Sequence, residues 1–386
     1  MLKIKDNFSI ARRYASLKYK LGNKVPNIIT SSGIVRVNDN NQLIFISIVG
    51  PDYDENTPNA MMTARMGYTN AFNGKGIPSL TIGIHQIRSV LEKHPNSICM
   101  IFGSDYIYLN EMQLSALKKH PHFVWVDPWF TDSNAFFRSH GLNPTVWTWS
   151  KSHRKKILKS NPTFVYTATV PSGLGFFEEW SNHGLDVVSL PLACDKTVYD
   201  KHSAGTIENK FIKYAFVGGY WTSKGKQIDK YLRPFEKDLH VYGYSPWPYS
   251  GYRGMLSRKG EVDLYQNAMV CPAINEPSVS LLKGQINERV FKVLGCGGCS
   301  VVDVVPAYRE LFSTDELIVP NSLQEFIDAM HELVSNESFR NTYSEMGYKA
   351  VRNRHTYDNR VGIALEKIWE DSRNDPRNRK IHHAEI

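Results

Sequence analysis

The regular alternation of short apolar runs with helical patterns constrains the fold of this chain more than any other feature. In the first half, apolar runs of strand length occur at residues 43–49, 98–102, 123–126, 164–166 and 187–190. Helical patterns lie between them at residues 61–72, 84–91 and 110–119. Most of these strands end in Gly, Asp or Pro, which predicts a parallel sheet with helices on both faces.

A second series of the same kind follows a polar stretch at residues 191–209. Its predicted strands are residues 214–217, 240–242, 268–271, 300–302 and 316–319. Ser322 and Glu325 have the spacing of a capping box, which predicts the start of a helix over residues 326–334. We therefore expect two doubly wound α/β domains, residues 1–195 and 196–355, followed by a helix and a charged tail over 356–386.

Ligands of such sheets bind beyond the carboxyl ends of the strands. In the first domain this rule places Gly50, residues 103–105 and Asp127 on one rim. Neither domain has a GxGxxG motif after its first strand, which argues against an ordinary dinucleotide dehydrogenase.

The composition is that of a soluble globular protein, with 42% hydrophobic and 22% charged residues. No apolar run approaches the roughly 20 residues of a membrane helix, and the N-terminus lacks the apolar region of a signal peptide. The five cysteines lie mostly within apolar runs. We expect reduced, buried thiols and a cytoplasmic protein.

The 46 Lys and Arg residues exceed the 38 Asp and Glu residues, which gives a net charge of +8. This balance suits an anionic ligand, DNA or another nucleic acid, or an anionic membrane surface, and does not separate them. On composition alone, an ordinary solvated basic surface is the favoured explanation.

The most informative single stretch is residues 285–303. Its apolar positions Ile286, Val290, Val293 and Leu294 share one helical face, and a Gly-rich segment then ends the helix before a β-branched strand. The polar residues Asn287, Glu288 and Arg289 fall at the start of this helix, where an anionic ligand is favoured.

A second candidate is Gly218-Gly219, which directly follows a predicted strand and precedes Lys224. Glycines at this place let backbone N–H groups approach a phosphate, and a lysine can neutralise it. The same glycines also suit a purely structural turn.

Cys296 and Cys299 have CxxC spacing, which is typical of redox and zinc sites. No second pair of ligands completes a zinc site, so we interpret the intervening glycines as the stop of the helix.

Asp127 lies at a strand end among the tryptophans 125, 129, 147 and 149. A carboxylate among aromatic rings can have a raised pKa and act as a general base. The alternative is a turn or N-cap aspartate, with the aromatic residues in the core.

The segment Asn287-Glu288-Arg289-Val-Phe-Lys-Val-Leu-Gly-Cys-Gly-Gly298 resembles the conserved segment of CgeB-like, spore-coat-maturation-type glycosyltransferases. Other landmarks are similar and in order: Leu190-Pro-Leu-Ala-Cys-Asp195, Phe216-Val-Gly-Gly219 and Arg354-His-Thr-Tyr-Asp-Asn-Arg360. The resemblance covers mainly the C-terminal half. These enzymes are similar to group 1 glycosyltransferases with the GT-B fold, in which two Rossmann-like domains face a cleft and the last helix crosses back to the N-terminal domain.

The resemblance implies metal-independent transfer of a hexosyl or pentosyl group from a nucleotide-diphosphate sugar, with no further cofactor. Gly218, Gly219 and Lys224 would approach the diphosphate. Asn287, Glu288 and Arg289 would hold the sugar and phosphates, with Arg289 stabilising the leaving group. Asp127 would be the base of an inverting reaction or, in a retaining one, would orient the acceptor.

One residue departs from the family pattern. Lys292 stands where most such sequences carry a glutamate that binds the donor ribose, and a lysine cannot accept hydrogen bonds from hydroxyl groups. The donor site around Lys292 is therefore unusual or has changed its role. The acceptor stays open between a glycan, a protein, a small molecule and DNA. The alternative to an enzyme is a binding protein of the same fold that has lost donor chemistry.

Overall fold

The computed structural model describes residues 42–51, 53, 60–126, 151–202, 211–276, 279, 282 and 284–372, and the chain divides into two compact units. The first unit comprises the described residues of Met1–Ala168, Leu174–Leu190 and Arg360–Ile386, and the second those of Thr169–Gly173 and Pro191–Asn359. The last helix, α14 (Tyr357–Ser372), begins in the second unit and continues in the first.

The first unit is built on a parallel sheet with the strand order β2-β1-β3-β4-β5-β6. These strands are β1 (Ile44–Val49), β2 (Ser79–Gly83), β3 (Ser97–Phe102), β4 (His122–Trp125), β5 (Phe164–Thr167) and β6 (Val187–Ser189). The strands expected from the apolar runs are all present. β2 was not predicted, because Ser79 and Thr81 interrupt its apolar pattern; both are nevertheless buried, and the Ser79 hydroxyl donates to the Thr69 carbonyl at 3.1 Å.

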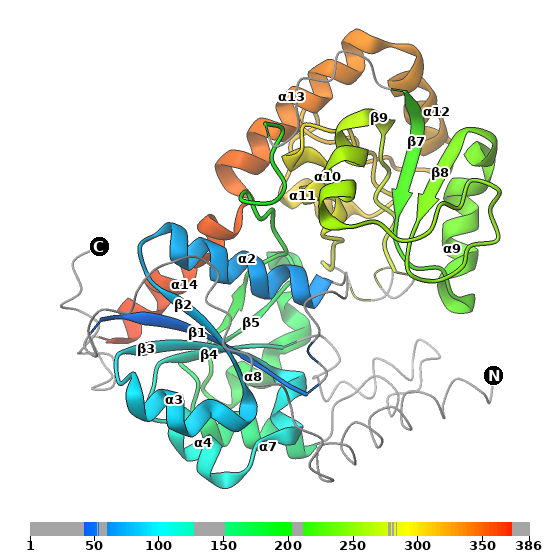
Figure 1. The fold of residues 1–386 in the computed structure, drawn as a ribbon. Helices are drawn as coiled ribbons and strands as arrows, with labels where there is room; N and C mark the ends of the chain where they lie inside the picture. The colour runs from blue at the N-terminus through cyan, green and yellow to red at the C-terminus, as the bar shows by residue number, and fades with distance from the viewer. Residues whose placement is uncertain are drawn as a thin grey trace. The chain divides into compact units, whose positions relative to one another are not determined.

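Helices pack on both faces of this sheet (Figure 1), because the pleat sends alternate residues of each strand to opposite sides. Ile44, Ile46 and Ile48 of β1 join a core with four helices on one face: α3 (Ile87–Lys93), α4 (Glu111–Leu117), α7 (Lys151–Ser160) and α8 (Glu178–Asn182). On the other face, Phe45 stacks on Phe72 of α2 (Ala60–Gly74) with ring centroids 3.9 Å apart.

The second unit has a smaller parallel sheet in the order β8-β7-β9. Its strands are β7 (Ile212–Val217), β8 (Leu239–Tyr242) and β9 (Ala268–Val270). Single bridges between Ala273 and Val302 and between Val301 and Ile318 continue the parallel pairing beyond β9. The segments predicted as strands at 300–302 and 316–319 are thus present only as bridges.

Two layers of helices enclose the second sheet (Figure 1). The first layer consists of α9 (Thr222–Leu232) and α12 (Leu323–Ser335), whose apolar residues share a core with β7. The second layer consists of α10 (Arg258–Asn267), α11 (Arg289–Gly295) and α13 (Glu337–Arg354). The Ser322 side chain accepts the Glu325 N–H, as predicted, and the Glu325 carboxylate binds the N–H of Asn321.

No helix within the described ranges is long and apolar enough to cross a membrane.

Candidate functional site

The loops that follow β7, β8 and β9 lie at the same edge of the second sheet, because parallel strands end at a common edge. Gly218 and Gly219 follow β7, and Tyr244 lies just beyond β8. Asn275 and Glu276 lie a few residues past β9. The loops after β8 and β9 therefore bring polar residues to the same edge as Gly218 and Gly219, which were predicted from their position after a strand.

The first two of these loops are tied together by hydrogen bonds. Gly218 donates its N–H to the Tyr242 carbonyl at 2.8 Å, and the Trp247 indole N–H donates to the Gly218 carbonyl at 3.0 Å. The Ser245 hydroxyl accepts the Tyr220 N–H at 2.8 Å and donates to the Tyr220 carbonyl at 3.1 Å. These bonds give the edge a defined shape without a ligand.

Arg289 reaches this edge from the first turn of α11. Its Nε donates to the Val217 carbonyl at 2.7 Å, and its guanidinium lies 4.1 Å from the centroid of the Phe216 ring. A Cβ atom on Gly218 would come within 2.8 Å of Arg289 Nη2. The structure thus brings Gly218 and Arg289 together, and a larger residue at position 218 would crowd the guanidinium.

Lys224 of α9 is a second buried cation at this edge. Its side chain is 4% exposed, and Nζ lies 2.5 Å from Glu276 Oε1, whose side chain is 39% exposed. Burial lowers the pKa of Lys224; the Glu276 carboxylate opposes this shift, and the positive charge of Arg289 adds to it. Lys224 is thus paired with the partly exposed Glu276, whereas Arg289 is held by the Val217 carbonyl, and two cations at one edge suit an anion.

A buried network fixes the segment that carries Asn287. Asp303, which is fully buried, accepts hydrogen bonds from the Asn275 backbone N–H at 3.1 Å and from Asn275 Nδ2 at 2.6 Å. The Tyr308 hydroxyl lies 3.2 Å from Asn275 Nδ2 and accepts the Asn287 N–H at 3.0 Å. Asn287 Oδ1 then accepts the Arg289 N–H at 2.8 Å, so this network holds Asn287 against the start of α11.

Lys292 does not stand free beside these residues. Its Nζ lies 2.8 Å from Glu288 Oε1 and 3.7 Å from Glu261 Oε1, and the lysine side chain is only 9% exposed. Glu261 also accepts hydrogen bonds from the hydroxyls of Tyr199 and Tyr265, each at 2.7 Å. Burial by itself would lower the pKa of Lys292, but the two carboxylates raise it well above its ordinary value. Lys292 is thus the charged centre of a buried ion cluster that includes Glu288.

The glycines after α11 end the helix, as predicted. Gly297 has φ +70°, a left-handed conformation that favours glycine, and Cys296 is the C-cap residue. All five cysteines are free and buried. Burial raises the pKa of Cys296, which is the opposite of what a reactive thiol requires. Among the described residues, no group of three or more His, Cys, Asp or Glu side chains could hold a metal ion.

Asp127 and the tryptophans 129, 147 and 149 lie outside the described residues, so the predicted base stays a prediction. Trp125, at the end of β4, is buried and packs edge-on against Phe102, with centroids 4.5 Å apart. In the same unit, Arg65 of α2 pairs with Asp105, which lies just after β3, at 2.7 Å.

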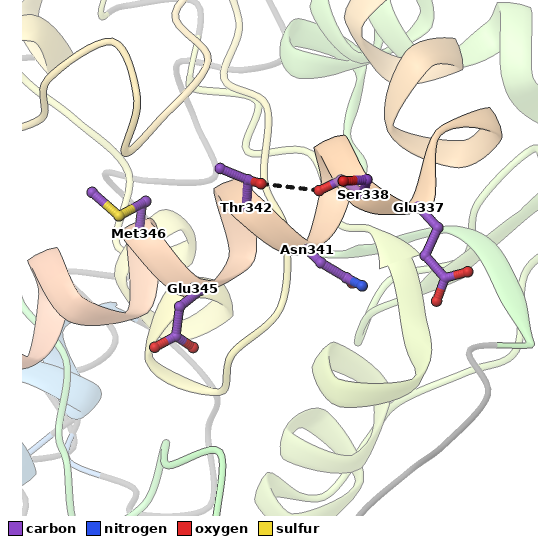
Figure 2. Close-up of a pocket in the computed structure, with 6 residues that line it drawn as sticks. All are labelled: Glu337, Ser338, Asn341, Thr342, Glu345 and Met346. Atoms are coloured by element: carbon purple, nitrogen blue, oxygen red, sulfur yellow. Dashed lines mark hydrogen bonds between the residues drawn. The ribbon is translucent and has the colours of Figure 1, made fainter.

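An open hollow of about 710 Å³ lies along one face of α13. Figure 2 shows the side chains that line it. It is lined by Glu337, Ser338, Asn341, Thr342, Glu345 and Met346. This lining contains two carboxylates and no cation, so it does not provide the anion site described above.

Sequence reasoning missed several residues of the site and its support, among them Asn275, Glu276, Tyr199 and Glu261. Asn275 and Glu276 follow a predicted strand and could have been found by the rule applied to Gly218. Tyr199 and Glu261 are far from Lys292 in sequence and carry no local signal, since only the folded chain brings their side chains together.

The two parallel α/β units and their topology define the GT-B fold of glycosyltransferases. Residues 226–366, which belong to the second unit up to Asn359, match the family model described as "Glycosyl transferase-like". The match covers α11 and the residues around it, including the segment on which the sequence resemblance was based.

Solved structures with the same fold cover most of the chain at low sequence identity. Sucrose-phosphate synthase from Thermosynechococcus elongatus has a TM-score of 0.56 at 10% identity, over 85% of this chain and 99% of that one. An alpha-glucosyltransferase in complex with UDP has a TM-score of 0.55 at 10% identity, over 84% and 98%. The DNA modifying enzyme beta-glucosyltransferase has a TM-score of 0.51 at 11% identity, over 80% and 94%. A comparison with curated protein sequences finds no match to this chain.

Proposed function

We propose that this protein is a glycosyltransferase that takes a hexosyl or pentosyl group from a nucleotide-diphosphate sugar bound by the second unit. The observation that carries the proposal is the pair of buried cations, Lys224 and Arg289, at the carboxyl edge of the sheet formed by β7, β8 and β9. The match of residues 226–366 to a glycosyltransferase family model supports it. So does the fold, because neighbours with this fold are described in complex with UDP or uridine diphosphoglucose.

In this proposal the diphosphate lies against Lys224 and Arg289, and Gly218 and Gly219 let the backbone approach it. The leaving diphosphate gains negative charge as the glycosidic bond to it breaks, and two preorganised cations stabilise that charge. Metal-independent catalysis is part of the proposal, because the protein supplies this positive charge itself. Asn287 and Glu288 contact the sugar or ribose hydroxyls, and Lys292 holds Glu288 in place.

Binding and hydrolysis of a panel of UDP-, GDP-, ADP-, CMP- and TDP-sugars test the donor. We expect one donor to bind in the micromolar range and to be hydrolysed slowly without an acceptor, with and without EDTA. Lys224→Gln should weaken binding at least tenfold, because it removes one of the two cations. Complete absence of binding and hydrolysis would favour the non-catalytic binding protein.

The acceptor belongs to the first unit in this proposal, with Asp127 as the base of an inverting reaction. Asp127→Asn should then abolish transfer and leave donor affinity unchanged, and unchanged turnover would remove that assignment. DNA is a candidate acceptor because of the net charge of +8 and the DNA-modifying enzyme among the structures of the same fold. A DNA acceptor requires affinity that falls steeply with salt concentration. Weak binding that is insensitive to salt would exclude DNA.

A further inference from the structure

Two large aromatic side chains of the second unit are exposed beside the proposed diphosphate site. Trp221 is 39% exposed and Tyr244 is 59% exposed, and they lie on the loops after β7 and β8. Both approach Gly219: a Cβ atom there would collide with the Trp221 ring and come within 3.0 Å of the Tyr244 hydroxyl oxygen. The two aromatic residues therefore converge on one point of the edge.

The loops that carry these residues are held rigidly. Ser245, next to Tyr244, binds both the N–H and the carbonyl of Tyr220, next to Trp221. The Tyr220 ring packs against Trp247 with centroids 5.1 Å apart, and its hydroxyl donates to Asp229 at 3.1 Å. Trp221 and Tyr244 are thus presented on a braced support, which lowers the entropic cost of binding a ligand.

The cations of the site lie directly beside this pair. Lys224 Nζ is 4.7 Å from the centroid of the Trp221 ring, and its carboxylate partner is Glu276. Burial raises the pKa of the Tyr244 hydroxyl, and the nearby Glu276 carboxylate raises it further. A ligand with an anionic group at Lys224 therefore places its neighbouring part against an aromatic surface. Nucleotides combine these two features in one molecule.

We propose that Trp221 and Tyr244 bind the nucleobase of the donor by stacking, a role that rests on the nucleotide-sugar donor proposed above. Bases bind aromatic side chains through their flat faces, and each stacked base contributes affinity with little dependence on base identity. The pair therefore supplies affinity for the nucleoside, whereas Lys224 and Arg289 supply affinity for the diphosphate.

The experiment compares the affinities of UDP and of inorganic pyrophosphate, which has the anionic groups without a base. Calorimetric titration of UDP and competition by pyrophosphate are measured for the wild-type chain, Trp221→Leu and Tyr244→Leu. Phe211→Leu is the matched control, because Phe211 is an aromatic residue of the same unit that is 77% exposed and lies at the opposite, amino end of β7. Thermal unfolding checks that each variant is folded.

We expect Trp221→Leu and Tyr244→Leu each to weaken UDP binding about tenfold, with pyrophosphate affinity and the control variant unchanged. ADP should lose affinity in the same proportion as UDP, since stacking tolerates either base. Equal losses for UDP and pyrophosphate would overturn the inference, because the pair would then act on the anion site. Unchanged UDP affinity in both variants would overturn it as well. A wild-type chain that binds no nucleotide would instead overturn the proposed function, and this inference with it.

Discussion

Lys292 offers the most direct test of how the second unit is stabilised. The sequence predicts Lys292 in the donor site, whereas the structure shows it buried between Glu288 and Glu261. Replacing it by methionine keeps an unbranched side chain, one atom shorter, and removes the charge. Glu288 and Glu261 would then remain as buried carboxylates without their cation, and both are at least 87% buried, with exposed side-chain fractions of 13% and 12%. Replacing it by glutamate, the residue of the family pattern, would place a third carboxylate among them.

The expected magnitude follows from the two distances. At an effective dielectric constant of about 20, charges 2.8 and 3.7 Å apart attract by about 6 and about 4.5 kcal/mol. Most of this attraction offsets the cost of removing the three charges from water. Breaking a buried pair by deleting one partner has a net cost of about 3–5 kcal/mol, because the remaining charge is left without compensation. We expect this loss for Lys292→Met, and a larger loss for Lys292→Glu.

Urea unfolding followed by circular dichroism measures the effect. For a change in free energy of this size, the midpoint of the transition should fall by about 1–2 M urea. The double variant Lys292→Met, Glu261→Gln should be more stable than Lys292→Met alone, since it removes one of the two uncompensated charges. A Lys292→Met protein with a free energy of unfolding within about 1 kcal/mol of the wild type would refute the reasoning. A Lys292→Glu protein as stable as the wild type would refute it as well.

Three further predictions follow from the same geometry. Because burial lowers the pKa of Lys224, this lysine loses its charge at a lower pH than an ordinary lysine, and UDP binding to the wild type should weaken from that lower pH upward. Titration calorimetry between about pH 7 and 10 measures this; an affinity that does not change with pH would contradict a contact between Lys224 and the diphosphate. Gly218→Ala should weaken UDP binding about tenfold by displacing Arg289, whereas Gly362→Ala, whose Cβ meets nothing within 4 Å, should leave it unchanged in the same titration. The pKa of Lys292 is raised in the folded state, so the stabilisation that Lys292 provides is fully present at neutral pH and is lost as the pH rises through that raised pKa. The pKa of Glu261 is lowered, so the stabilisation that Glu261 provides is present above the ordinary glutamate pKa of 4.5 and is lost as the pH falls through the lowered pKa. Urea midpoints across the pH range should show both losses in the wild type, and the acid loss should be smaller in Glu261→Gln.

The periodic pattern of the chain was sufficient to predict the two parallel α/β units. Strands such as β1 and β3 are continuous apolar runs because a central parallel strand is buried on both faces, and this signal is local in sequence. The pattern failed where burial is achieved by polar residues. β2 contains Ser79 and Thr81, whose hydroxyl groups are buried in the folded chain, and its pairing with β1 depends on partners that the local pattern does not reveal.

The sequence by itself identified Gly218 and Gly219 at a strand end and Arg289 at a helix start, and the family resemblance assigned all three to one donor site. Only the tertiary structure decided what they touch. It showed that Gly218 makes room for the Arg289 guanidinium and that Lys224 is paired with Glu276. It also joined Tyr199, Glu261 and Glu288 around Lys292, although these residues are up to 93 positions from it in the chain. The physical reason is that backbone periodicity is set by near neighbours, whereas the state of a buried charge is set by whichever partners the fold brings within a few ångströms.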